Sequence, residues 1–345
     1  MKGLFIASAL TLVGSCATTR YSTKIDNLKK NIQLTDSATV MHYANTITAN
    51  ELKTHLYTYA SDNFEGRKTG ELGQKKAAKF LENYYKSEGI LSPINDSIYF
   101  QSISKDYLPN EIQSTENVLA FIKGSEKPDE VVIISAHLDH LGIEGEELFN
   151  GADDNGSGTT ALMEMAQAFN LAAKDGFLPK RSILFLHLTG EELGLYGSRY
   201  YIENPVFDLE KTMADLNIDM IGRIDKKHEA NPNYLYLIGA DRISKELHFI
   251  SEKINDTYFN LDLDYTYNEE TDQNRYYFRS DHYKFALKNI PVIFYFNGEH
   301  DDYHKASDTA DKIEYDLLTK RAKLIFTTAW HLANQEHDLV HNEDI

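Results

Sequence analysis

The chain has 345 residues and is poor in cysteine and in positive charge. Its single cysteine, Cys16, has no partner for an intramolecular disulfide. Lysine and arginine number 35 against 53 aspartates and glutamates, so the formal net charge is −18. A nucleic-acid-binding protein normally presents a basic face, and this balance argues against that class. The acidity favours solubility and contact with cationic groups such as peptide amino termini.

Other absences narrow the choice further. The sequence contains no G-x-S-x-G stretch, which argues against a serine hydrolase. It has no internal repeat and no low-complexity segment, and beyond the N-terminus no stretch is apolar enough to span a bilayer. Hydrophobic residues make up 42% of the chain, which is enough for a sizeable core in one large α/β domain or two small ones.

The N-terminus carries an apolar run behind a short basic start. Residues 4–13 are too short to cross a membrane but suit the core of a signal peptide. Gly14 and Ser15 then precede Cys16. This order resembles a bacterial lipoprotein signal over residues 1–16, which implies that Cys16 is acylated. We therefore expect export and a lipid anchor in a bacterial membrane, the outer one, with the folded domain in the periplasm or at the cell surface. The alternative is an ordinary secretory signal cleaved near Ala17.

The rest of the chain predicts a tether followed by one α/β domain. Residues 17–47 show no sustained period and predict a tether and N-terminal strap outside the core. Residues 48–345 predict a single domain. Thr48 and Glu51 form a capping box before a first helix, and a second helix over about 72–88 ends at Gly89. Further helical patterns begin near residue 157 and cover about 242–255 and 313–334.

Short, nearly continuous apolar runs predict buried central strands. They occupy residues 131–135, 182–188, 212–218 and 291–296. Because helical patterns separate several of these runs, we expect an α/β fold with three α/β/α layers around a mixed, mostly parallel sheet.

Each predicted strand runs into histidine or acidic residues. In chain order these are His137 and Asp139, then Glu191 and Glu192, then Asp219, and finally a stretch that contains His300 and His304. The loop NGADDNGSG at 150–158, with Asp153 and Asp154, precedes a predicted helix at the same edge. Ligands of open α/β sheets bind beyond the carboxyl ends of the strands, so we expect these side chains to meet there.

This mixture of imidazole and carboxylate without thiolate suits zinc or a similar divalent ion. Crowded carboxylates repel one another unless cations lie between them, and two histidines with three acids fit two ions that share one carboxylate and one water. Each residue alone has a simpler explanation. Asp153 or Asp154 could cap the next helix, Glu191 and Glu192 could be a first-turn pair, and His137 could be a buried core histidine. Their shared position at strand ends favours the metal site.

Five motifs in order carry a resemblance to a known family. They are AHLDH (136–140), NGADDNGSG (150–158), TGEELG (189–194), NIDMIGR (217–223) and YHKASD (303–308). The sequence resembles the zinc-dependent aminopeptidases with a co-catalytic metal pair, a group that includes bacterial leucyl aminopeptidases, glutamate carboxypeptidase II and glutaminyl cyclases. The resemblance runs from about residue 65 to about 313. The apical domain that such proteins often insert before the first metal-binding strand has no room here.

The resemblance implies a role for each site residue. His137 would bind one zinc ion together with Glu192, and Asp219 with His304 would complete the other. Asp154 would bridge both ions, and Asp139 would orient the imidazole of His137 from behind. Glu191 would be the general base. Asp153 and Asn155 would support the loop, and His282 in the motif SDH (280–282) would not be a ligand.

The implied chemistry is hydrolysis of N-terminal residues from peptides with a free amino terminus, through a metal-bridged water and the Glu191 base. A glutaminyl cyclase with a single zinc is the first alternative, although the GADD acid pair that it typically alters is intact here. A dipeptidase or carboxypeptidase, and an inactive binding module, are the others. The module would lack ligands or the base, and none is missing.

Two further patterns resemble metal sites but fail as such. HDDYH (300–304) spaces two histidines like a helical metalloprotease motif, but it has aspartate in place of glutamate and no apolar helical stripe. DLD (262–264) suggests calcium, but no glycine stands at the sixth position of an EF-hand loop.

Overall fold

The computed structural model describes residues 21–95 and 97–345. Cys16 and the apolar run before it lie outside the described residues, so the lipid anchor stays a prediction. Within the described part, no helix combines the length and the apolar character that crossing a bilayer requires.

The fold is built on one sheet of eight strands in the order β1-β2-β6-β3-β7-β10-β8-β9. The four predicted strands are β3 (Lys127–His137), β6 (Arg181–Leu188), β7 (Thr212–Ile218) and β10 (Val292–Phe296). They lie side by side and parallel at its centre. All of them are buried at their carboxyl halves, which explains why they read as continuous apolar runs.

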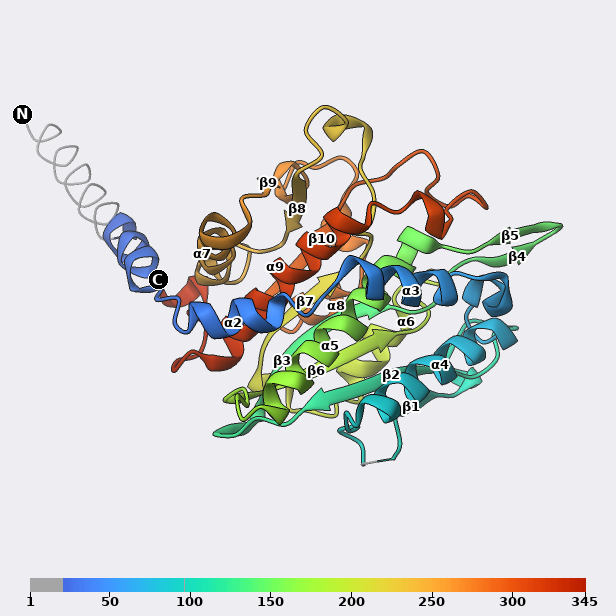
Figure 1. Ribbon diagram of the computed structural model, residues 1–345, viewed down its shortest axis with the longest axis horizontal. Helices are drawn as coiled ribbons and strands as arrows, with labels where there is room; N and C mark the ends of the chain where they lie inside the picture. The colour runs from blue at the N-terminus through green and yellow to red at the C-terminus, as the bar shows by residue number, and fades with distance from the viewer. Residues whose placement is uncertain (1–20, 96) are drawn as a thin grey trace, which may run out of the picture.

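The parallel centre is flanked by an antiparallel strand on each side, and the sequence patterns predicted neither these strands nor the outermost ones. On one side β2 (Thr115–Ile122) pairs antiparallel with β6, and β1 (Phe100–Ile103) pairs with β2. On the other side β8 (Tyr234–Ile238) pairs antiparallel with β10, and β9 (Asp262–Asp264) completes the sheet. The sheet is therefore mixed with a parallel centre, as expected. A separate hairpin of β4 (Gly142–Glu144) and β5 (Glu147–Phe149) projects from the body (Figure 1).

Alternate residues of β3 divide the interior into two layers. Val132 and Ile134 belong to the main core beneath α5 (Gly158–Lys174) and α9 (Tyr315–Asn334). Val131 and Ile133 belong to a second cluster with side chains of α6 (Tyr196–Glu203) and α8 (His282–Ala286). Helices thus cover both faces of the sheet, and the three-layer α/β/α prediction is confirmed (Figure 1).

The remaining helices lie on the α5 and α9 side. They are α2 (Ser37–Ala44), α3 (Ala49–Tyr59), α4 (Leu72–Glu88) and α7 (Lys245–Ile254), and residues 21–31 are also helical. The predicted N-cap is present, because the Glu51 N–H donates to Thr48 Oγ1 at 3.2 Å, and the Thr48 hydroxyl in turn donates to the Glu51 carboxylate at 2.7 Å. Gly89 follows α4 with a positive φ of 72°, a conformation that favours glycine.

The expectation that residues 17–47 lie outside the core is wrong for the later part of that segment. Val40, Tyr43, Ala44 and Ile47 are buried in the main core, and the Tyr43 ring stacks on Trp330 at 5.8 Å. Val40, Tyr43 and Ala44 lie on one face of α2 at the spacing i, i+3, i+4, and Ile47 follows three residues after the helix ends. The apolar stripe was therefore present in the sequence, but it is too short to stand out among its polar neighbours.

Candidate metal centre

The predicted site residues meet at one edge of the sheet, beyond the carboxyl ends of its parallel strands. His137 is the last residue of β3, and Asp219 directly follows β7. Glu191 and Glu192 lie in the loop after β6, and His304 lies in the loop after β10. Asp153 and Asp154 of the NGADDNGSG loop lie in the turn before α5. Five segments far apart in the sequence thus deliver imidazoles and carboxylates to one place, as the strand-end pattern predicted.

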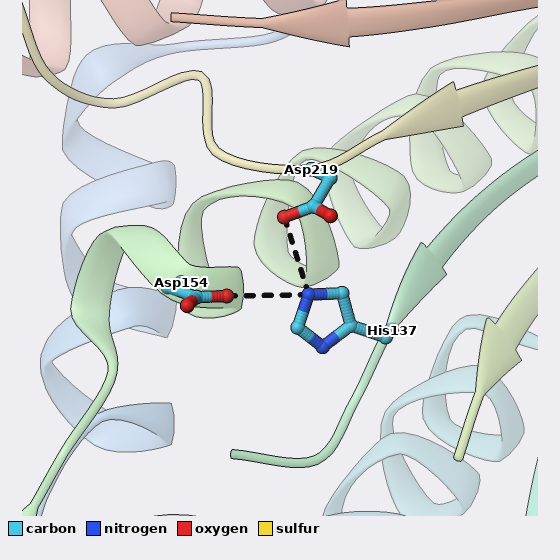
Figure 2. A group of neighbouring side chains, drawn as sticks. All are labelled: His137, Asp154 and Asp219. Atoms are coloured by element: carbon cyan, nitrogen blue, oxygen red, sulfur yellow. Dashed lines mark hydrogen bonds and ion pairs between the residues drawn. The ribbon is translucent and has the colours of Figure 1, made fainter. Parts of the chain in front are cut away.

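The first cluster consists of His137, Asp154 and Asp219. The Nε2 atom of His137 lies 3.2 Å from Asp154 Oδ1 and 3.2 Å from Asp219 Oδ1 (Figure 2). One potential ligand atom from each residue lies within 4.8 Å of the other two, and all three side chains are buried. This set of one nitrogen and two oxygens in close reach suits a single divalent ion.

The second cluster shares Asp154 with the first. His304 Nε2 lies 3.1 Å from Asp154 Oδ2 and 3.4 Å from Glu192 Oε2. Asp154 thus presents Oδ1 to one cluster and Oδ2 to the other, the arrangement expected of a bridging carboxylate. The pairing differs from the one that the resemblance implied, because His137 lies with Asp219 and His304 lies with Glu192. His140 lies closer still, because His140, Asp154 and Glu192 form the second group whose potential ligand atoms lie within 4.8 Å of one another, and His304 borders that group without belonging to it.

Asp139 links the loops that carry the site. Its backbone carbonyl lies 3.2 Å from His137 Nδ1, while its carboxylate lies 4.0 Å from the same nitrogen. The carboxylate accepts hydrogen bonds from the Thr69 hydroxyl at 2.6 Å and from the Glu191 N–H at 3.2 Å. The imidazole of His137 is therefore oriented mainly by a carbonyl, which leaves its Nε2 toward the acids. The carboxylate instead holds the loop of Glu191 against that of His137.

Asp153 and Asp154 have different partners in the loop before α5. The N–H groups of Asp153 and Asp154 donate to the buried carboxylate of Asp308 at 2.9 and 3.1 Å. The side chain of Asp153 turns away from both clusters, accepts from the Gly222 N–H at 2.7 Å and lies 3.1 Å from His300 Nε2. Asp153 therefore anchors the turn while Asp154 faces the candidate ions.

Three of the remaining expectations can be compared with the geometry. The side-chain oxygen Oδ1 of Asn155 accepts from the Gly158 N–H at 3.0 Å, so Asn155 supports the start of α5. His282 belongs to neither cluster, and its ring stacks on Phe294 at 4.9 Å. Within HDDYH, residues 301–304 form a turn and not a helix, and His300 faces Asp153.

The buried side chain of Arg67 supports the loops of the site, a role that sequence reasoning did not single out. Its guanidinium donates to the backbone carbonyls of Leu138 at 3.1 Å, Asn150 at 2.7 Å and Gly151 at 2.8 Å. These carbonyls flank His137 on one side and the Asp154 turn on the other. The planar fork of arginine suits several such contacts at once, so Arg67 ties the two ligand-bearing loops together.

Charge at the centre is unbalanced without cations. Burial raises the pKa of the Glu191 and Glu192 carboxyl groups well above their usual range, and neighbouring acids add to the rise. Burial also opposes ionisation of Asp154, but contacts with His137 and His304 outweigh it and hold its pKa well below the usual range. Few protons and few positively charged groups are available to neutralise these carboxylates. A divalent ion in each cluster would relieve that competition, so this donor set fits the metals that the residue types suggest.

Glu191 borders a small cavity beside both clusters. The cavity is lined by Asp154, Asp219 and His304 on one side and by the apolar side chains of Met220, Phe294 and Phe296 on another. Tyr276, Arg279, Glu299 and Tyr303 complete its wall. Glu191, which belongs to neither group of candidate ligands, thus borders the space next to them, where a reacting group would lie.

The supporting residues that sequence reasoning missed are His140, Thr69, Arg67 and Asp308. His140 stands inside the quoted motif AHLDH, and Asp308 ends the quoted motif YHKASD. Their position in these motifs was the available signal, but their roles depend on which loops pack together. Thr69 carries no pattern of its own.

Comparison with known proteins agrees with the geometry. The chain is 30% identical over 258 residues to leupeptin-inactivating enzyme 1 of Streptomyces exfoliatus, an alignment that covers 74% of this chain and 50% of that protein. The chain spans about half or less of the length of the first curated relatives that it matches.

Two solved structures share the fold. A zinc aminopeptidase from Bacillus subtilis superimposes with a TM-score of 0.66 at 16% identity, covering 84% of this chain and 96% of that one. A glutaminyl cyclase from Bacteroides thetaiotaomicron superimposes with a TM-score of 0.62 at 15% identity, covering 82% and 98%. At these identities the likeness concerns the fold alone.

A match between the sequence and a protein-family model identifies the family. Residues 117–329 match Peptidase family M28, and they include every residue of the two clusters and Glu191. This is more than half of the chain. The protein is therefore a member of Peptidase family M28.

Proposed function

We propose that the protein is a di-zinc aminopeptidase that removes N-terminal residues from peptides. The observation that carries the proposal is the pair of clusters joined through Asp154, with Glu191 beside them in the same cavity. Under this proposal His137 and Asp219 hold one ion, Glu192 and His304 hold the other, and Asp154 holds both. Bound divalent ions supply a Lewis acid for the scissile carbonyl and lower the pKa of water in their reach.

Glu191 would move the proton during hydrolysis. Its carboxylate would take a proton from the attacking water and return that proton to the nitrogen of the leaving peptide. The hydrogen bond from its own N–H to Asp139 places its backbone, and burial keeps its carboxyl group away from bulk water. The same residue therefore serves first as base and then as acid.

A peptide with a free amino terminus should be shortened one residue at a time, whereas its N-acetyl form should be resistant. The reason is that a neutral amine can bind at an open metal position and an acetylated one cannot. Activity should rise as the substrate amine loses its proton, whose pKa is about 8 in reference peptides. Mass spectrometry of the products from both peptides over a pH series checks this expectation. Similar rates of cleavage for the two forms would refute the assignment.

The same assay separates the alternatives. A carboxypeptidase would accept the N-acetyl peptide and reject a C-terminal amide, and a dipeptidase would cleave dipeptides and leave longer peptides whole. A glutaminyl cyclase would release ammonia from N-terminal glutamine without breaking a peptide bond. An inactive binding module would leave every peptide intact.

We also propose that Cys16 anchors the protein to a bacterial membrane through lipid, on the order of the N-terminal motif alone. The variant Cys16→Ser should then remain unprocessed or appear in the soluble fraction, whereas the wild type sediments with membranes. Mass spectrometry of the mature N-terminus checks this. A mature chain that begins beyond Cys16 without modification would contradict the anchor.

A further inference from the structure

The small cavity beside the two clusters has a polar side and an apolar side. Side chains of both clusters border it on the polar side. Its apolar side consists of Met220, Phe294 and Phe296, each no more than 3% exposed. Under the proposed function, the amine and the scissile carbonyl of a peptide lie at the ions. The side chain of the first residue is then left to face the apolar wall.

Packed aromatic rings fix the size of this cavity. The rings of Phe294 and Phe296 lie 5.2 Å apart, and the Tyr276 ring lies 5.0 Å from that of Phe296. Tyr276 also lines the cavity and is only 6% exposed. Close-packed side chains of this kind yield little to a group that is too large. The cavity has a volume of about 40 Å³, which is room for roughly three water-sized groups.

Arg279 and Glu299 meet at the rim of the cavity from two separate segments. Arg279 follows the short helical turn Tyr276–Phe278, and Glu299 lies in the loop after β10. Arg279 Nη2 lies 3.3 Å from Glu299 Oε1, and the two side chains are 43% and 39% exposed. The guanidinium also lies 4.7 Å from the centre of the Tyr276 ring and 3.5 Å from the Tyr303 hydroxyl. An exposed ion pair alone stabilises little, but three contacts together hold the guanidinium at the rim.

The same pair decides which charge the cavity accepts. The positive charge of Arg279 and the negative charge of Glu299 offset each other. A charged side chain that entered the cavity would leave water for an apolar wall without an unpaired partner of opposite sign, which is unfavourable. A neutral apolar side chain gains from burial against the same wall. The cavity therefore suits a side chain that is both short and uncharged.

We propose that Arg279 and Glu299 close the pocket for the first side chain and restrict the enzyme to peptides that begin with a short apolar residue, of alanine to valine size. The three carbon atoms of a valine side chain match the volume of the cavity. This inference rests on the proposed aminopeptidase function and deepens it by naming the substrate class. Arg279 and Glu299 determine specificity and take no part in metal binding or proton transfer.

The test measures kcat/KM of the zinc-loaded protein for tripeptide amides that differ only in their first residue. That residue is alanine, valine, leucine, phenylalanine, glutamate or lysine, and two alanines follow it. We expect the valine peptide to exceed the leucine and phenylalanine peptides by roughly 10–200-fold, the discrimination that one methylene group too many produces in an apolar pocket. The glutamate and lysine peptides should also be poor substrates. A phenylalanine peptide cleaved as fast as the valine peptide would overturn the inference.

Two variants open the rim from its two sides. Arg279→Ala and Glu299→Ala should each raise kcat/KM for the phenylalanine peptide at least roughly 10-fold relative to the valine peptide. A general loss of stability would not produce this gain. Zinc content should stay at the wild-type level, because neither residue belongs to a cluster. Calorimetry with free valine and free phenylalanine should show the same change in binding without turnover. An unchanged ratio in both variants would mean that the pair does not limit the pocket.

Two further variants separate size from charge and from surface effects. Glu299→Gln keeps the length of the side chain and an acceptor for Arg279, so the order of substrates should not change. If it instead makes the glutamate peptide the best substrate, Arg279 recognises acidic side chains and the inference fails. Arg199→Ala is the matched control. Arg199 pairs with Glu203 at 3.1 Å and lies 5.4 Å over the Tyr107 ring, but it does not line the cavity, so its loss should leave the ratio unchanged.

The wild-type series also reports on the proposed function by itself. If every unblocked peptide stays whole, the aminopeptidase assignment is refuted and this inference with it. If the peptides are shortened from their amino termini but phenylalanine or leucine is preferred, only the inference about Arg279 and Glu299 is refuted.

Discussion

Replacing Glu191 by glutamine should lower kcat by roughly 10²–10⁴-fold while zinc content stays at the wild-type level, because general acid–base catalysis contributes about that much. Glutamine keeps the shape of the side chain and its position in the cavity, but it cannot take a proton from water. Glu191 belongs to neither metal cluster, so the ions should remain bound. Steady-state kinetics on an unblocked peptide, together with elemental analysis of the same preparation, measures both quantities.

The neighbouring residue provides the matched control. Glu192→Gln differs from Glu191→Gln by one position in the chain, but its carboxylate lies 3.4 Å from His304 and faces the second cluster. It should weaken zinc binding first and lose activity as a consequence, and excess zinc should partly restore its rate. The reverse result, in which Glu191→Gln loses zinc and Glu192→Gln keeps it, would exchange the two roles.

Replacing Asp154 by asparagine should weaken both ions together. Its two carboxylate oxygens lie in different clusters, at 3.2 Å from His137 and 3.1 Å from His304. The loss at each site should exceed the roughly 10–100-fold that removal of a supporting residue costs, because a shared ligand and its negative charge are removed at once. Zinc content after dialysis against a weak chelator checks the expectation.

Asp153→Asn is the control for this change. It alters the adjacent residue in the same way, but the asparagine oxygen can still accept from the Gly222 N–H. Zinc should remain at both sites. Loss of only one ion from Asp154→Asn would mean that Asp154 does not bridge. Loss of both ions from Asp153→Asn would mean that Asp153, and not Asp154, is the bridging ligand.

Several features of the fold could be predicted because they depend on local chemistry. The apolar runs of β3, β6, β7 and β10 are buried on both sides, which produces continuous hydrophobic sequence without any knowledge of partners. The strands outside the parallel centre were not predicted, because their sequences are less uniformly apolar and their pairing depends on the strands beside them in the sheet. The apolar face of α2 was overlooked for a related reason. A helix of two turns is buried only through its packing partners, here Trp330 against the Tyr43 ring.

The sequence by itself determined the chemistry of the centre. Histidine and acidic residues at successive strand ends specify imidazole and carboxylate donors at the carboxyl edge of a parallel sheet, because parallel strands all end on the same side. Which of the two adjacent acids faces the ions was implied only by the family resemblance of the quoted motifs, because the residues alone left both aspartates open as helix caps.

Only the tertiary structure decided which of these residues lie together. His137 and Asp219 share a cluster because β3 and β7 are neighbours in the sheet, where Ala136 is paired with Ile218 and the next residue of each strand is the ligand. Glu192 follows β6 on the other side of β3 and meets His304 across the bridging Asp154. Strand order in space differs from strand order along the chain, so no spacing in the sequence encodes this pairing. The contact between His140 and Glu192 arises in the same way, from two loops that the hydrogen bond from the Glu191 N–H to the Asp139 carboxylate brings together.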